Sequence, residues 1–491
     1  MSSDVHTRQG RREANGHRAT IAKPRLAVSD LASGALGVAE AHKARAVARA
    51  RARRLPRSDA EAHRQRGLAR LKTATGGGPT KILRLDMTNV LSGNDYSAQL
   101  SIGAKGAVTN VILDTGSSTL AVEPAVYSGA GDKDLKPTTL MQLVTYGTGG
   151  WAGPVVNTTL TLGAGAGQVV LPNCPIAITS VQEKGNFQGV TGIMGLAYNG
   201  LNNAFDFKTY LAGQRKTSTY PWPFGKAWNN FLSGFRTLLQ QARATEVEVK
   251  PYFDQVEEGG VVANKFAFYT LRSWVSLRRG TTVAAVTADP LNKGYFILGG
   301  GEEQKDLYTD PFVTVKVLHD LYYNTNLKSV RVDGCAAHPA APLQPQYQAT
   351  AISNSIVDSG TSDLTLAQDV FQAIQRGLQQ RNPAFTEAIE MAANTRGGVS
   401  AASLKLAQWP NIYFTLEGEN GQDVELACTP QTYWQTDFPA AGQAVFQISG
   451  PFEQANQSIL GLPLMNNYYT VFDRTQDVNG VIRFAKIKPP A

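Results

Sequence analysis

Cysteine is scarce in this chain of 491 residues, which contains only Cys174, Cys335 and Cys428. The three lie far apart in the sequence, so they indicate neither a disulfide framework nor the ligand spacing of a metal site. A single bridge between two of them stays open, and the sequence does not indicate which two would pair. We therefore expect no metal and no cofactor.

Long apolar runs are also missing. No run approaches the roughly 20 apolar residues of a membrane-spanning helix, which predicts a chain without a membrane span. The first 30 residues are polar and lack the apolar core of about 7–15 residues that is typical of a secretory signal. Taken literally, this absence predicts a cytoplasmic location, with secretion as the alternative.

Acidic and aromatic residues are sparse at the start of the chain. Residues 1–81 carry 18 Lys and Arg against 6 Asp and Glu, a balance of +12, whereas the remaining 410 residues carry 29 against 33, a balance of −4. The formal charge of +8 therefore belongs to a basic N-terminal extension. Its composition, followed by the glycines at 76–78, predicts a flexible segment with a hinge after it. Since no aromatic residues interleave the basic ones, we expect no nucleic acid partner.

The rest of the chain is rich in glycine and in short apolar segments. Hydrophobic residues make up 42% of the chain and charged residues 18%, with 47 glycines. These values indicate a globular protein with many turns and mostly β structure. From Lys81 onward the pattern becomes strand-like, and the segment from Asp95 to Gly103 alternates apolar and polar residues with period two.

One loop pattern occurs twice. In Val111 to Leu120 and again in Ile356 to Leu366, a short apolar strand runs into an Asp, a small hydroxyl residue, a Gly and a further hydroxyl residue. The glycine lets the chain turn sharply after the acid. Two such loops indicate two similar lobes that present Asp114 and Asp358 to each other.

Each Asp loop has a second segment that also repeats. An apolar pair followed by a glycine occurs in Thr191 to Gly200, at Gly195, and in Ser458 to Asp473, at Gly461. These segments predict one further short strand for each Asp loop. A single Asp-Thr/Ser-Gly-Thr/Ser match would be weak evidence, whereas two matches with the same supporting pattern are strong.

These repeats resemble the pepsin-like aspartic proteases of the two-lobed, single-chain kind. The resemblance implies a mostly β, bilobal acid-protease fold with two related β-barrel-like lobes and a central cleft. It places the first lobe at residues 82–300, with an insertion at about 201–250 where the match lapses, and the second lobe at residues 301–491. One chain then carries both loops, so a monomer is sufficient.

The resemblance also assigns roles. Asp114 and Asp358 become a catalytic dyad, in which two carboxyl groups about 3 Å apart share one proton; this picture was established for pepsin itself and is carried over with the resemblance. One carboxylate then activates a water molecule, and the other hydrogen-bonds the developing oxyanion. The supporting positions around the two acids are Thr115, Gly116, Ser117, Ser359, Gly360 and Thr361.

The segment from Leu143 to Val156 has two extended runs around a Gly-rich turn, which predicts a β-hairpin. It resembles the family's flap, with Tyr146, Gly147 and Thr148 in contact with substrate. The family usually has Trp where this chain has Ala121, so the support of Tyr146 stays open, and packing of Trp151 would compensate. Asp363 stands where an apolar residue is usual, and it either favours a basic substrate side chain or points to solvent.

The function that the sequence favours is an aspartic endopeptidase that acts at acidic pH and cuts an extended polypeptide between bulky apolar residues. The alternative is a non-catalytic binding or inhibitor protein on the same fold. For residues 1–81 three hypotheses stay open: a solvated tail, an inhibitory prosegment that pairs with the catalytic carboxylates, and a targeting or polyanion-binding arm.

Overall fold

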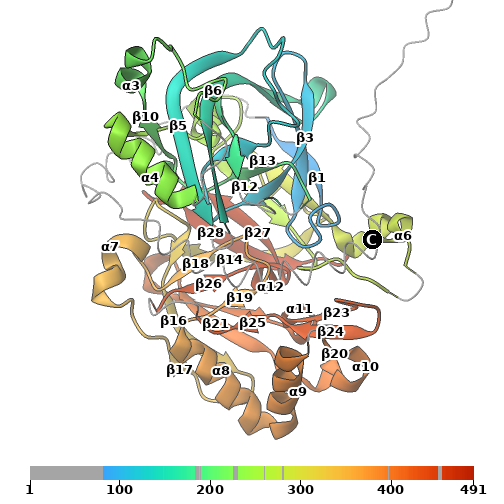
Figure 1. Cartoon of the computed structure of the whole chain (residues 1–491). Coiled ribbons are helices and arrows are strands. Elements are labelled where there is room, and N and C mark those ends of the chain that lie inside the picture. Colours follow the sequence, from blue (N-terminus) through green and yellow to red (C-terminus); the bar gives the residue numbers. More distant parts are fainter. Residues whose placement is uncertain are drawn as a thin grey trace, which may run out of the picture.

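The computed structural model describes residues 81–490 except 147–148, 183–186, 188, 225–230, 259, 279–280, 396 and 452–455. Two lobes are stacked in Figure 1, one in blue and green and one in orange. We call the half built around strands β2 to β11 the first lobe and the half built around β15 to β26 the second lobe. The expected mostly β, two-lobed fold is confirmed. Among the helices of the described residues, none is long and apolar enough to cross a membrane.

A closed barrel forms the first lobe. Within the described residues, pairing of β6 with β2 closes a ring of six strands in the order β2, β3, β9, β4, β7, β6. Their inward-facing side chains, such as Leu100, Leu113 and Val156, are fully buried, as the period-two pattern predicts. The strands are β2 (Ser97–Ile102), β3 (Ala107–Asp114), β4 (Leu120–Val122), β6 (Gly149–Leu162), β7 (Val169–Ile178) and β9 (Gly192–Gly195).

The segment at 201–250, where the family resemblance lapses, extends this barrel. Strand β10 pairs with β5 and with β11, and helices α3 and α4 bury Leu211, Phe235 and Leu238 in one apolar cluster with Met141 of β5. The elements are β5 (Lys136–Tyr146), β8 (Val181–Gln182), β10 (Asn203–Asp206), β11 (Thr245–Glu248), α3 (Lys208–Gly213) and α4 (Phe231–Ala242).

A shared group of strands joins the lobes. Strand β12 pairs with β13 on one side and with β27, from the end of the chain, on the other. Phe266 of β12 stacks on Phe472 of β27, with ring centroids 5.0 Å apart. The elements of this region are β1 (Leu83–Thr88), β12 (Lys265–Tyr269), β13 (Lys293–Leu298), β14 (Tyr308–Lys316), β27 (Tyr468–Asp473), β28 (Val481–Ile487), α5 (Tyr252–Glu258) and α6 (Val283–Ala288).

The second lobe consists of three small sheets in the described residues. The first contains β15 (Asn324–Thr325), β18 (Ser355–Val357), β19 (Leu364–Thr365), β25 (Ile448–Ser449) and β26 (Ser458–Leu460). The second contains β16 (Leu327–Val332), β17 (His338–Pro339), β21 (Ile412–Glu417) and β22 (Asp423–Cys428). The third contains β20 (Val399–Ser400), β23 (Trp434–Thr436) and β24 (Gln443–Phe446).

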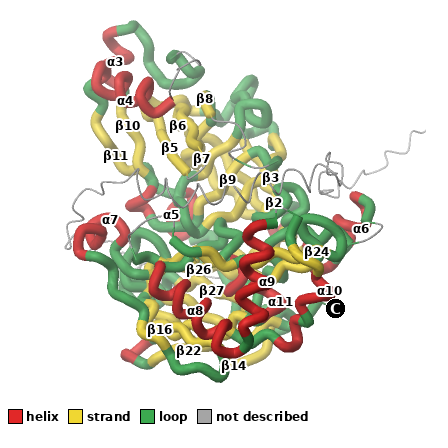
Figure 2. The backbone as a smooth tube through the Cα atoms, turned by 60° about the horizontal axis from the view of Figure 1, so that its bottom comes forward, coloured by secondary structure: helices red, strands yellow, loops and turns green. Residues whose placement is uncertain are grey.

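Helices cover the side of the second lobe that faces away from the first, and Figure 2 shows α8 and α9 on this surface. Helix α8 packs on β16 and buries Val370, Ile374 and Leu378, whose four-residue spacing places them on one face. Helix α9 begins at Pro383, after Asn382 accepts a hydrogen bond from the Ala384 N–H, a favourable cap. The helices are α7 (Gln348–Ala351), α8 (Gln368–Arg381), α9 (Pro383–Asn394), α10 (Ala401–Leu404), α11 (Pro430–Tyr433) and α12 (Leu462–Met465).

The three cysteines are free thiols, so the bridge that the sequence left open does not form. Cys174 and Cys428 are fully buried in the main core. Burial raises the pKa of the Cys428 thiol to about 12, because the thiolate would lose its hydration. Both thiols are therefore packing groups.

Candidate active site

The first Asp loop follows from a buried strand. Strand β3 runs parallel to β9, which places Asp114 opposite Gly195. A Cβ atom at Gly195 would lie 2.5 Å from the backbone carbonyl carbon of Ser117, so only glycine lets the supporting strand approach the loop this closely. The repeated glycine noted in the sequence is therefore a contact point between loop and strand.

The Asp114 carboxylate lies in a shell of hydrogen-bond donors. The Gly116 N–H donates to Oδ1 at 2.8 Å, and the Ser117 hydroxyl donates to Oδ2 at 2.6 Å. The side chain is only 1% exposed. Both oxygens are thus oriented by groups of the same short loop, which fixes the direction of the carboxylate.

The Asp358 carboxylate is held in the same way. The Gly360 N–H donates to Oδ1 at 2.9 Å, and the Thr361 hydroxyl donates to Oδ2 at 2.7 Å. Strand β18 runs parallel to β26, and a Cβ atom at Gly461 would lie 2.2 Å from the carbonyl oxygen of Asp363. The two loops therefore share one design.

Reciprocal hydrogen bonds brace the two loops against each other. The Thr115 hydroxyl accepts from the Ser359 N–H at 2.8 Å and donates to the Val357 carbonyl at 3.2 Å. In return, the Ser359 hydroxyl accepts from the Thr115 N–H at 3.1 Å and donates to the Leu113 carbonyl at 2.9 Å. These bonds join residues that are 242 to 246 positions apart in the sequence and bring Asp114 and Asp358 into one site.

The second loop also touches the first carboxylate. A Cβ atom at Gly360 would lie 2.3 Å from Oδ1 of Asp114. The Asp114 carboxylate therefore lies directly against the backbone that follows Asp358, and any side chain at this position would displace it.

The hairpin expected at residues 143–156 is present, since β5 and β6 pair in antiparallel register with Tyr146 opposite Gly149. Tyr146 ends β5, and its side chain is not among those described; Gly147 and Thr148 lie outside the described residues. Trp151 is fully buried, and its indole packs in the apolar cluster to which Ala121 also belongs.

Sequence reasoning missed the fifth residue of each loop. The Ser118 hydroxyl donates to the Tyr198 carbonyl at 2.5 Å, and the Ser362 hydroxyl donates to Oδ1 of Asp95 at 2.7 Å. The signal was available, because the repeat places Ser at the same position in both loops. Asp363 is half-buried and accepts a hydrogen bond from the Ser449 hydroxyl at 3.2 Å.

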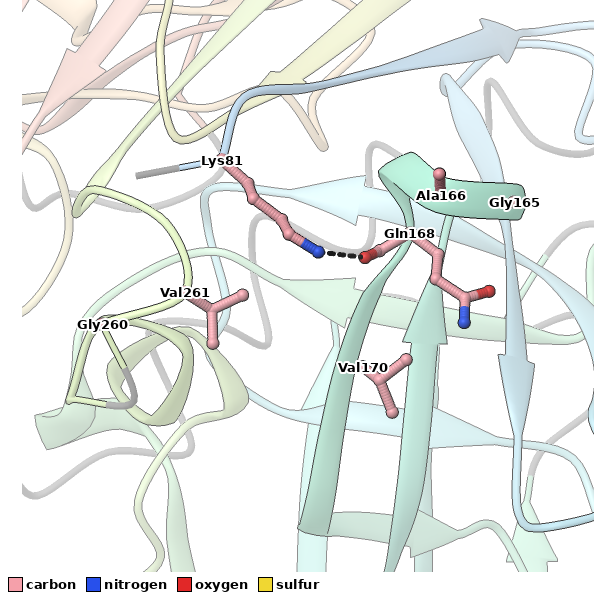
Figure 3. A pocket seen from close by; sticks show the side chains of 7 residues that line it. All are labelled: Lys81, Gly165, Ala166, Gln168, Val170, Gly260 and Val261. Atoms are coloured by element: carbon pink, nitrogen blue, oxygen red, sulfur yellow. Dashed lines mark hydrogen bonds between the residues drawn. The ribbon is translucent and has the colours of Figure 1, made fainter. Parts of the chain in front are cut away.

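No metal cluster supplements this site in the part of the chain that the structure describes. No group of three His, Cys, Asp or Glu side chains there could hold a metal ion. A separate open cavity has a volume of about 600 Å³. The Lys81 ammonium beside it donates to the Gln168 carbonyl at 3.3 Å, the bond drawn as a dashed line in Figure 3. None of the site residues lines this cavity, so it lies on a different part of the surface. The cavity is lined by Lys81, Gly165, Ala166, Gln168, Val170, Gly260 and Val261.

Comparison with known proteins supports the resemblance to pepsin-like aspartic proteases. The family model described as eukaryotic aspartyl protease matches residues 243–487, which include Asp358, whereas Asp114 precedes the match. Pepsin-2B of Gadus morhua is 23% identical over 401 residues, covering 79% of this chain and 95% of the relative. Pepsin A of Sus scrofa is 23% identical over 402 residues, covering 79% of this chain and 80% of the relative. With the two-lobed fold, these matches show that the chain belongs to the pepsin-like family of aspartyl proteases.

Proposed function

We propose that this protein is an aspartic endopeptidase with Asp114 and Asp358 as its catalytic dyad. One observation carries the proposal: two buried carboxylates are each oriented by a glycine N–H and a hydroxyl, and reciprocal bonds between Thr115 and Ser359 join their loops. A surface pair of acids needs no such shell, because water would solvate it.

The proposed reaction adds water across a peptide bond. Two neighbouring carboxyl groups share one proton, because like charges at this separation cannot both ionise. The ionised member takes a proton from a bound water as its oxygen attacks the carbonyl carbon, and the protonated member hydrogen-bonds the oxygen that becomes negative. Transfer of a proton to the nitrogen then breaks the C–N bond and releases an acid and an amine.

The donor shell supports this reaction because it orients both acids. Ser117 and Thr361 each bond to the Oδ2 atom of their acid, and Gly116 and Gly360 each bond to Oδ1. Since both oxygens of each acid are held, the carboxylates are oriented before substrate binds, which lowers the cost of reaching the transition state.

We assign Tyr146, Gly147 and Thr148 to a flap that closes over an extended polypeptide and excludes water. We expect cleavage between bulky apolar residues at acidic pH, with a single chain sufficient for activity. Residues 82–300 and 301–491 are proposed as the two lobes, with residues 1–81 as an extension whose role the experiment below addresses.

A non-catalytic binding or inhibitor protein on the same fold is the competing function. Loss of either Asp, or of the groups that orient it, would favour that alternative. Both acids are present here with equivalent donors, which favours an enzyme.

The test compares the full chain with a form that lacks residues 1–80. Casein cleavage is measured from pH 3 to 7, with and without pepstatin, alongside the variants Asp114→Ala and Asp358→Ala. We expect pepstatin-sensitive cleavage in the acid range and a loss of roughly 10²–10⁴-fold or more in each variant. Absence of cleavage by both forms would end the peptidase proposal, and full activity in Asp114→Ala would reject the dyad. Cleavage by the truncated form alone would favour an inhibitory prosegment over a solvated tail.

A further inference from the structure

Arg474 is an unusual residue for its position. It directly follows β27, yet its side chain is only 1% exposed. Three aromatic rings surround the guanidinium, whose central carbon lies 4.1 Å from the ring centroid of Tyr198, 4.8 Å from that of Phe253 and 5.5 Å from that of Tyr323. A buried charge is costly unless it is fully paired, so the partners of this guanidinium indicate what it does.

The guanidinium donates in three directions. Nη2 donates to the Leu196 carbonyl, Nε donates to the Tyr323 hydroxyl at 2.9 Å, and Nη1 lies 3.5 Å from Oδ1 of Asp254. The Tyr323 hydroxyl donates in turn to the same Leu196 carbonyl at 3.0 Å. Burial by itself lowers the pKa of Arg474, but Tyr323, Tyr198 and Asp254 outweigh it and raise the pKa above its ordinary value. The side chain therefore stays charged.

One branch of this network reaches the first Asp loop. Leu196 directly follows β9, and its N–H donates to the backbone carbonyl of Asp114 at 2.7 Å. The next N–H, that of Ala197, donates to the Ser117 carbonyl at 2.7 Å. Arg474 is thus bonded to the peptide segment that holds the first acid from behind.

The other branch reaches the second Asp loop. The Tyr323 carbonyl accepts a hydrogen bond from the Val357 N–H at 3.2 Å, and Val357 immediately precedes Asp358. Tyr323 therefore links the guanidinium to the second loop through its backbone, while its hydroxyl contacts the support of the first.

We propose that Arg474 is a positioning residue that fixes the two Asp loops relative to each other through a single buried guanidinium. The inference rests on the proposed peptidase function, since its effect is read from cleavage. Guanidinium chemistry is needed because the planar group offers several N–H donors in fixed directions and stacks on aromatic rings. A lysine keeps the charge but cannot reach the Leu196 carbonyl, the Tyr323 hydroxyl and Asp254 from one nitrogen.

The test uses Arg474→Lys and Tyr323→Phe in the full protein, with Arg483→Lys as the matched control. Arg483 lies on the adjacent strand β28, is 23% exposed and pairs with Glu302 and Asp473, so it carries the same charge in a neighbouring ion-pair network. For each variant, kcat and KM are measured on a fluorogenic peptide, and thermal melting establishes the folded fraction at the assay temperature. Tyr323→Phe removes a hydroxyl without removing the charge, so it tests the network even where Arg474→Lys does not fold.

We expect kcat of Arg474→Lys to fall roughly 10–100-fold, since a misplacement of about 1 Å costs up to about 10²-fold. Tyr323→Phe should lower kcat several-fold, and KM should stay nearly constant in both. An active wild type with unchanged kcat in folded Arg474→Lys or in Tyr323→Phe overturns the inference, as does an equal loss in Arg483→Lys. A wild type that cleaves neither peptide nor casein under acid conditions overturns the peptidase proposal itself, which is a distinct result.

Discussion

The two Asp loops match each other closely at the acid and diverge at their attachments. The donor distances agree within 0.1 Å, at 2.8 and 2.9 Å for the glycine N–H and 2.6 and 2.7 Å for the hydroxyl. One residue further on, Ser118 bonds to a backbone carbonyl of its own lobe, whereas Ser362 bonds to the Asp95 side chain of the other lobe. The orientation of each carboxylate is therefore a local property, while the position of each loop depends on the rest of the molecule.

The lobes also differ in what they add around the loops. The first lobe carries the β5–β6 hairpin, in which Trp151 packs against side chains of the barrel. The second lobe carries helices α8 and α9 on the side that faces away from the first lobe (Figure 2). A change in the hairpin should consequently alter substrate handling, and a change of similar size in the second-lobe core away from the Asp358 loop should alter stability alone.

Trp151→Ala and Trp434→Ala test whether the hairpin is special. Both indoles are fully buried, and Trp434 contacts Trp409 and Phe446 of the second lobe. Each change should reduce the free energy of unfolding by about 3–5 kcal/mol, because it removes a large side chain from a packed core. Only Trp151→Ala should also change KM, since only Trp151 anchors the proposed flap. Urea unfolding and peptide kinetics measure the two effects, and equal changes in KM would contradict the contrast.

Gly461→Ala and Gly195→Ala test the strands beneath the loops. The new Cβ would lie 2.2 Å from the Asp363 carbonyl oxygen in one case and 2.5 Å from the Ser117 carbonyl carbon in the other. We expect a loss of about 3 kcal/mol in stability for Gly461→Ala and somewhat less for Gly195→Ala, with activity lowered in both. Thermal unfolding and casein cleavage are the measurements. Gly167→Ala is the control, because nothing lies within 4 Å of its Cβ; the prediction fails if all three variants behave alike.

Thr115→Val and Ser359→Ala test the symmetry of the brace. Each change removes two buried hydrogen bonds. Each should therefore reduce the free energy of unfolding by about 1–3 kcal/mol, and the two variants should lose kcat by similar factors. Ser359→Thr keeps the hydroxyl and should retain activity. Chemical denaturation and kcat compare the variants. A much larger loss of stability and kcat in one of the two variants would show that Thr115 and Ser359 do not contribute equally.

Asp132→Asn tests the acid response of the first lobe, with the smallest expected effect. Burial raises the pKa of Asp132, but hydrogen bonds from Thr158, Tyr127 and two backbone N–H groups outweigh it and lower the pKa from 3.8 to about 2. The carboxylate therefore stabilises the fold above about pH 4, and this stabilisation is lost as the pH falls toward 2.

Because Asp132 is partly exposed, the change to Asn should cost only about 1 kcal/mol at pH 5 and almost nothing at pH 2. Tyr127→Phe removes one of the donors and should show the same trend at smaller size. Thermal melting at pH 5 and at pH 2 measures this difference. An equal loss of stability at both pH values would show that the ionised Asp132 carboxylate does not stabilise the fold.

Much of the fold and the site could be predicted because short segments of the sequence encode them. The Asp loops, the glycine strands beneath them and the hairpin each appear as a contiguous pattern of buried strand, turn glycine and hydroxyl residues. The attachments could not be predicted in this way. Arg474 follows a strand, where an arginine is usually solvated, and only the fold brings Tyr198, Phe253 and Tyr323 around it. The Asp95–Ser362 bond likewise spans 267 positions, so no short segment of the sequence indicates it.

The pairing of β12 with β27 has a consequence for biosynthesis. Strand β12 pairs with β13 on one side, but the partners of residues 265–268 on the other side are residues 470–473, and Arg474, whose guanidinium connects both loops, directly follows them. Contacts between such distant segments form late and slowly, since a long loop must close before they stabilise anything. A ribosome-bound chain that has already folded its barrel still lacks the second acid and the brace. The proposed dyad therefore takes its final arrangement only after residues 470–474 have been added to the chain.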